Sequence, residues 1–68
     1  MYIVIELQTT NGNTANITTQ YADRNTAEQA YHTILAAASV SPVDIHTALI
    51  VDERGTVIKR EFYDHTEA

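Results

Sequence analysis

The chain has 68 residues, of which nine are acidic and four are basic, and it contains no cysteine. This length allows one domain, residues 1 to 68, near the lower limit at which a chain folds on a hydrophobic core alone. Without cysteine the chain has neither disulfides nor thiolate zinc sites, so a good core or self-association must supply its stability. The formal charge of −5 argues against binding to nucleic acid or to an anionic membrane, because both require a positive surface.

The first 21 residues predict an antiparallel hairpin. Residues 2–8 alternate with a period of two, which places Ile3, Ile5 and Leu7 on one side and the residues between them on the other. Asn11-Gly12 is the dipeptide that best tolerates positive φ in a hairpin turn, and the segment NITTQY, which contains β-branched residues, follows it. One face of the second strand is expected to hold Ala15, Ile17, Thr19 and Tyr21. The opening run has no basic residue, so it predicts a strand, not a signal peptide or membrane span, and a cytoplasmic location is expected.

A helix is expected from the segment DRNTAEQA onward, with Asp23 or Asn25 as its N-cap and Glu28 as the partner in a capping box. The stretch from Ser39 to Pro42 ends it, since proline removes a backbone donor and biases the preceding residue away from helix. Its apolar residues form one continuous stripe at helical spacing: Ala27, Ala30, Tyr31, Ile34, Leu35 and Ala38.

Residues 44–52 and 56–64 predict a second hairpin, joined by the turn sequence DERG. If the turn spans residues 52–55, Val51 lies opposite Val57, Ile50 lies opposite Ile58, and His46 comes close to Phe62. The element order is then β-β-α-β-β, an α+β fold with a four-stranded, mainly antiparallel sheet and one helix packed on one face.

One helix covers only one side of such a sheet, and the last two strands are apolar on both sides. Large exposed apolar patches are uncommon on soluble monomers, so we expect a homodimer or higher oligomer that packs through the sheet face away from the helix or through strand edges. The predicted interface residues are Leu49, Val51, Val57 and Tyr63, joined by Tyr2 and Val4. The alternative is a monomer with a few scattered exposed aliphatic residues.

Three histidines are the other candidates for chemistry. On the helix, His32 faces solvent, one turn after a glutamate, and a solvated surface explains it. The second hairpin gathers Asp44, His46, Asp64 and His65 at one end of the sheet, where two imidazoles and two carboxylates could hold a zinc-like ion. The opposing interpretation is that they are unpaired surface residues, because the spacing matches no fixed motif and chain ends fray. We therefore assign no metal ligand, cofactor or catalytic residue.

The segments DRNTAEQAYHTILAAASVS, HTALIVDERG and EFYDH resemble a group of short proteins encoded by phages, prophages and related mobile elements of Bacillota. The similarity runs from Asp23 to His65, and the pattern of that group includes residues matching His32, His46 and His65. Where this chain has DERG, the group tends to have TEEG, which leaves the turn in place. The resemblance implies a genomic setting but no activity.

Two classes of function follow from these observations. The first is a non-enzymatic binding or assembly module that acts as a homo-oligomer, with itself and possible phage or host proteins as partners. The alternative is a metal-binding or small enzymatic unit built on Asp44, His46, Asp64 and His65. A tight oligomer without metal favours the first, and stoichiometric metal favours the second.

Overall fold

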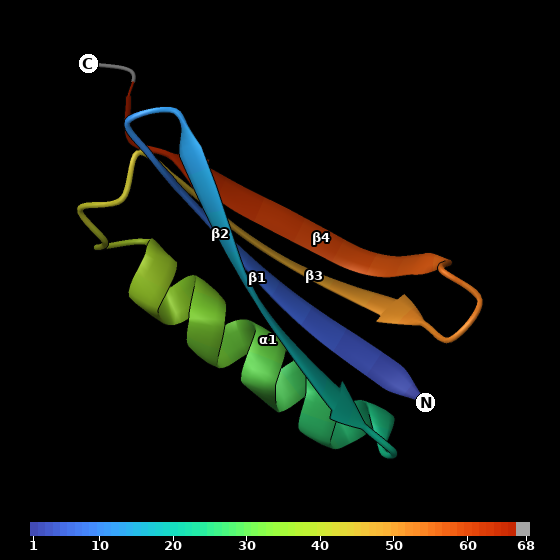
Figure 1. The fold of residues 1–68 in the computed structure, drawn as a ribbon. Helices are drawn as coiled ribbons and strands as arrows, with labels where there is room; N and C mark the ends of the chain where they lie inside the picture. Colours follow the sequence, from blue (N-terminus) through green and yellow to red (C-terminus); the bar gives the residue numbers. More distant parts are fainter. Residues whose placement is uncertain (67–68) are drawn as a thin grey trace.

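A computed structural model describes residues 1–66 and shows an α+β fold in the order β-β-α-β-β (Figure 1). The elements are β1 (Tyr2–Thr10), β2 (Asn13–Tyr21), α1 (Arg24–Ala38), β3 (Ile45–Asp52) and β4 (Val57–Asp64). The strands form one sheet in the order β2-β1-β3-β4, and every neighbouring pair is antiparallel. The predicted fold class is therefore confirmed.

The first hairpin closes through the two-residue turn Asn11-Gly12. Both residues have positive φ, 53° and 80° respectively, as a turn that matches the strand twist requires. The pairing of β1 with β2 then runs without a shift from Thr10–Asn13 to Tyr2–Tyr21. The two longest strands are thus fixed by one turn.

The N-cap of α1 is Asp23, which resolves the choice between Asp23 and Asn25. Its Oδ2 accepts hydrogen bonds from the backbone N–H and the hydroxyl of Thr26, each at 3.0 Å. These bonds hold the pKa of the Asp23 carboxyl below its usual value. Glu28 makes no capping box; it binds Arg24 at 2.9 Å and Lys59 of β4 at 2.7 Å, which ties the helix to the sheet.

The core lies between α1 and one side of the sheet. Val4, Ala48 and Ile50 from the strands are buried against Ala27 and Tyr31 of the helix. Burial raises the pKa of the Tyr31 hydroxyl. The stripe predicted for the helix is confirmed, since its members are either buried or packed against this core.

The position of Val4 corrects one prediction. The helix-facing side of β1 holds Tyr2 and Val4, together with the polar residues Glu6 and Gln8 that alternate with them. Tyr2 and Val4 therefore do not belong to the sheet face away from the helix. That face carries the other set of β1 instead, with Ile3 opposite Val51 of β3.

A bulge in the second hairpin corrects another prediction. Val51 pairs with Val57 as expected, but Ile50 pairs with Lys59, so that Ile58 is an extra residue and packs on the core. His46 consequently lies opposite Tyr63, not close to Phe62. Because the extra residue reverses the alternation that follows it, Tyr63 moves to the helix-facing side and Phe62 to the opposite one.

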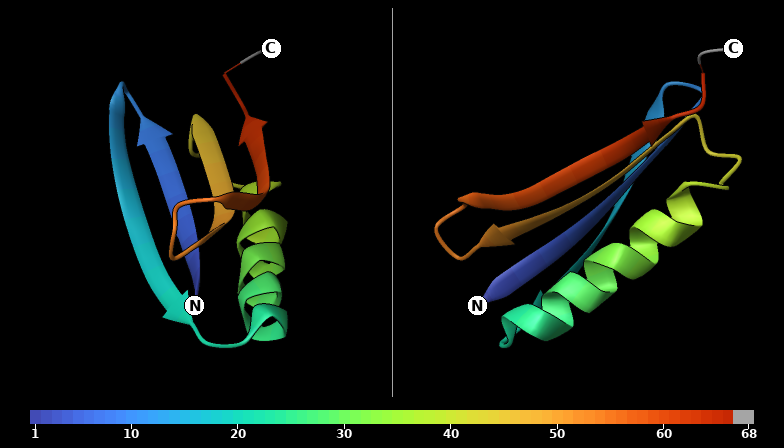
Figure 2. Two further views of the ribbon diagram at one scale, coloured as in Figure 1. Left: turned by 90° about the vertical axis from the view of Figure 1, so that its right-hand side faces the viewer. Right: turned by 180° about the vertical axis from the view of Figure 1, so that it is seen from behind.

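We call the side of the sheet away from α1 the uncovered face; it stays bare along the whole sheet in the described chain (Figure 2). Its apolar residues come from three adjacent strands and are half-buried or exposed. They are Ile3, Ile5, Leu7, Ile45, Leu49, Val51, Val57 and Phe62. Of the predicted interface residues, Leu49, Val51 and Val57 thus lie on this face. In residues 1–66, no helix is both long and apolar enough to cross a membrane.

Candidate functional site

The four residues predicted as a possible metal site do lie at one end of the sheet. The start of β3 pairs with the end of β4, with Ile45 opposite Asp64. Just beyond the strands, the backbone N–H of His65 donates to the carbonyl of Asp44 at 2.7 Å. The topology therefore gathers this segment as expected.

Their side chains, however, bind separate partners. The Asp44 carboxylate accepts from the backbone N–H of Asn11 at 3.0 Å, and His65 Nε2 contacts the carbonyl of Ala38 at 2.9 Å. Hydrogen bonds from the Thr66 side chain and backbone lower the pKa of Asp64. Within residues 1–66, no group of three or more potential ligands is arranged to hold a metal ion. Asp44 and His65 thus tie this end of the sheet to the first hairpin turn and to the end of α1, and Asp64 holds the segment that follows β4.

His46 is the exception, because it forms a buried hydrogen bond with a carboxylate on the neighbouring strand. Its side chain is on the helix-facing side, only 4% of the residue is exposed, and Nε2 lies 2.6 Å from Oε2 of Glu6. Gln8 donates to the same oxygen at 2.8 Å. His46 Nδ1 has no hydrogen-bond partner among the described residues. Glu6 is therefore held in one position by His46 on one side and Gln8 on the other.

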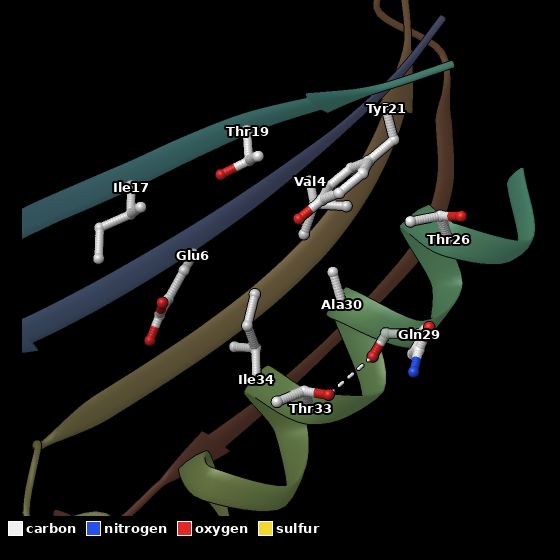
Figure 3. Close-up of a pocket in the computed structure, with 10 residues that line it drawn as sticks. All are labelled: Val4, Glu6, Ile17, Thr19, Tyr21, Thr26, Gln29, Ala30, Thr33 and Ile34. Atoms are coloured by element: carbon white, nitrogen blue, oxygen red, sulfur yellow. Dashed lines mark hydrogen bonds between the residues drawn. The ribbon is translucent and has the colours of Figure 1, made fainter. Parts of the chain in front are cut away.

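Glu6 also lines an open groove between α1 and the β1–β2 hairpin (Figure 3). The groove has a volume of about 410 Å³. Its walls come from the two strands and from the first three turns of the helix. The lining residues are Val4, Glu6, Ile17, Thr19, Tyr21, Thr26, Gln29, Ala30, Thr33 and Ile34.

The groove exists because α1 packs mainly over β1 and β3 and leaves β2 at the margin (Figure 2). Ile17 of β2 points into this space and is 57% exposed. Glu6 supplies the carboxylate of the groove, and its Oε1 accepts no hydrogen bond from the described residues. The walls carry apolar side chains together with threonine and glutamine, and Glu6 adds one fixed anionic group, an arrangement that suits recognition of an amphipathic cation.

The uncovered face is the second candidate surface. Its centre is apolar, and its margins are polar, with threonine, asparagine and glutamine along β2 and Arg60 and Asp64 along β4. Phe62 is 48% exposed and Val57 is 54% exposed. The guanidinium of Arg60 lies 6.0 Å from the centroid of the Phe62 ring. An apolar centre inside a polar rim is the usual composition of a protein interface.

Reasoning from the sequence missed the groove. The alternation of residues 15–21 does place Ile17 and Tyr21 on one face, but only the position of the helix shows that this face is half covered. The available signal was Glu6, the one charged residue of β1. Its partner His46 is 40 residues away, and only the pairing of β1 with β3 brings them together.

Comparison of the chain with family models, curated proteins and solved structures gives no match in any of the three.

Proposed function

We propose that this chain is a small non-enzymatic binding and assembly module that works as a homodimer through the uncovered face of its sheet. The observation that carries the proposal is the group of apolar side chains across β1, β3 and β4, among which lie the polar residues Thr47 and Arg60. Soluble monomers rarely leave a patch of more than a few hundred Å² of this kind in water. A function that requires association explains why it is kept.

The size of the face suits a dimer. Strands of eight or nine residues at ~3.3 Å per residue, spaced ~4.8 Å apart, give a projected area of roughly 500–600 Å² for four strands. Side-chain relief adds to this value, which brings it toward the ~800 Å² per partner of a standard interface. At about 25 cal/mol/Å², burial of several hundred Å² of apolar area stabilises the assembly by several kcal/mol per chain.

A second copy is the occupant that the face favours. Two such sheets can pack at a spacing of ~10 Å, with the helices on the outside of the assembly. Arg60 and Asp64 lie on the same strand at the margin of the face, so a twofold arrangement can bring opposite charges together. Such an arrangement would add contacts between opposite charges at the margin to apolar contacts at the centre.

Two further observations support a binding function. The residues of the possible metal site are engaged in separate local contacts, which favours the non-enzymatic class over the metal-binding alternative. The resemblance to phage- and prophage-encoded proteins favours an accessory role in the cytoplasm, with a phage or host protein as the other partner.

The test is a charged substitution at the centre of the face. Leu49 lies between Ile5 and Arg60 in the sheet, and Leu49→Lys should convert the dimer to a monomer in light scattering, because a dimer would have to bury the ammonium group. Gln20→Lys adds the same charge to the same face at the β2 margin and should leave the dimer mass unchanged. Phe62→Ala should weaken the dimer at least about tenfold without adding charge. Equal masses for Leu49→Lys and Gln20→Lys would contradict the proposal.

A further inference from the structure

The two edges of the sheet differ in how well they are protected. β4 has the bulge at Ile58 and four charged residues, Lys59, Arg60, Glu61 and Asp64, which discourage an added strand. β2 has nine residues, NTANITTQY, with no charge and no proline, and it pairs with β1 without a shift. The edge of β2 thus lacks the usual devices that prevent strand addition.

The hairpin determines which backbone groups of β2 are free. The residues that flank its two-residue turn, Thr10 and Asn13, form a hydrogen-bonded pair, and such pairs alternate along an antiparallel ladder. The residues of β2 between these pairs therefore direct their backbone N–H and C=O groups away from β1. They are Thr14, Asn16, Thr18 and Gln20. A new strand can bond to these groups without disturbing the existing sheet.

An added strand would extend the floor of the groove described above. Every second side chain of it would lie beside Ile17, Thr19 and Tyr21, on the side of the sheet that faces α1. There the exposed side chain of Ile17 would gain a neighbour, and the helix residues Gln29 and Thr33 would form the opposite wall. Main-chain bonds would supply affinity, and the groove would supply selectivity.

Glu6 determines the charge that this groove prefers. It pairs directly with Ile17 in the β1–β2 register, so a residue opposite Ile17 on an added strand is two strand spacings, about 10 Å, from Glu6. The aliphatic stem of a lysine or arginine can cross Ile17 while its charged end reaches the carboxylate. β2 itself contains no lysine or arginine, so a second copy paired through β2 would not provide this cation.

We propose that the β2 edge and the adjoining groove bind an extended segment of a partner protein that carries a lysine or arginine opposite Ile17 and aliphatic residues two positions away on either side. This site is separate from the uncovered face, because its side chains lie on the other side of the sheet. Peptide binding and dimer formation can thus fail independently.

The experiment uses a displayed library of peptides with nine residues, the length of β2, in which alternate positions are threonine and the others are random. Selection on the full chain should enrich sequences with one lysine or arginine flanked by aliphatic residues. A selected peptide is then synthesised, and its affinity is measured by fluorescence anisotropy. Replacement of its basic residue by norleucine should weaken binding at least about tenfold.

Two variants of the protein locate the peptide. Thr18→Pro removes an outward N–H that β1 does not use, and it should weaken binding at least about tenfold relative to Thr18→Ala, which keeps that N–H. Glu6→Gln leaves the edge intact and should reduce the difference between the lysine and norleucine peptides to less than about threefold. Leu49→Lys should bind the peptide like the wild type, which separates this site from the dimer face.

Several outcomes would overturn the proposal. One is a library that shows no enrichment, and another is enrichment of sequences without a basic residue. Equal affinity of Thr18→Pro and Thr18→Ala for the selected peptide would exclude the β2 edge. A wild-type mass that falls to half in Thr18→Pro, with no peptide present, would show that a second copy occupies this edge instead.

Discussion

At the scale of single residues, the contact between His46 and Glu6 is the most consequential polar interaction in the chain. Both side chains lie on the helix-facing side, near Val4 and Ala48, and the hydrogen bond between them compensates for the burial of two polar groups. Glu6 also faces the groove, so the same contact that joins β1 to β3 fixes the anionic group of the proposed peptide site. The Glu6 carboxylate thus has a structural role and, in the proposed peptide site, a binding role.

His46→Ala should lower the free energy of unfolding by about 2 kcal/mol or more, because it leaves Glu6 without its closest partner and opens a cavity beside β1. Urea denaturation followed by circular dichroism measures this change. His32→Ala is the matched control, since His32 is exposed on α1, and it should change stability by less than about 0.5 kcal/mol. Equal losses for the two variants would show that the buried contact contributes nothing specific.

At the scale of elements, the ion pairs of Glu28 and the bulge in β4 determine how the helix and the second hairpin fit together. Glu28 of α1 bridges Arg24 and Lys59, and it is Lys59 that the bulge places opposite Ile50 on the helix-facing side. Hydrogen bonds from Lys59 first, and then from Arg24, lower the pKa of Glu28 below its ordinary value of 4.5. This part of the stability therefore depends on pH.

A group with a lowered pKa in the folded state stabilises fully above its unfolded pKa, and that contribution is lost as the pH falls through the folded value. The urea midpoint of the wild type should exceed that of Glu28→Gln at pH values above 4.5, and the difference should shrink as the pH falls further below it. Glu53→Gln is the control, because Glu53 is exposed and contacts the N-terminal ammonium. A difference between wild type and Glu28→Gln that stays constant with pH would contradict this assignment.

Local patterns in the sequence were sufficient to predict the helix and the four strands. They were not sufficient to predict which side of β1 and of β4 faces the helix. The turn residues Asn11-Gly12 and Gly55 have the positive φ values that their types favour, and the helical stripe packs on the sheet as its spacing predicts. In β1, however, the two alternating sets gave no indication of which one the helix covers. The set with Val4 and Glu6 faces the helix, and this choice depends on contacts with α1 and β3, which are long-range.

The bulge in β4 is the second feature that could not be predicted from the sequence. One extra residue at Ile58 exchanges the faces of Phe62 and Tyr63. Residues 57–64 contain no glycine or proline that would indicate a bulge. The groove was missed for a related reason, since it depends on how far α1 lies from β2. Pairing partners and layer offsets are properties of the assembled sheet, whereas turns and helix caps are encoded within a few residues.

At the scale of the whole molecule, the chain is a two-layer domain, and we propose a separate task for each side of its sheet. The helix-facing side forms the core and, at the margin under β2, the groove (Figures 1 and 3). The uncovered face, bare from β1 to β4, is assigned to a second copy. For a chain of 68 residues, burial of that face in the proposed dimer would add a large share of the apolar area available for stability.

Self-association of the wild-type chain can be measured by sedimentation equilibrium. Over a range from about 1 μM to about 100 μM, in which a Kd of the order of 1 μM is measurable, the mass should rise to twice the chain mass of 7.6 kDa. The urea midpoint should rise over the same range, because dimer formation stabilises the fold by mass action. A mass that stays at 7.6 kDa throughout that range would contradict the account.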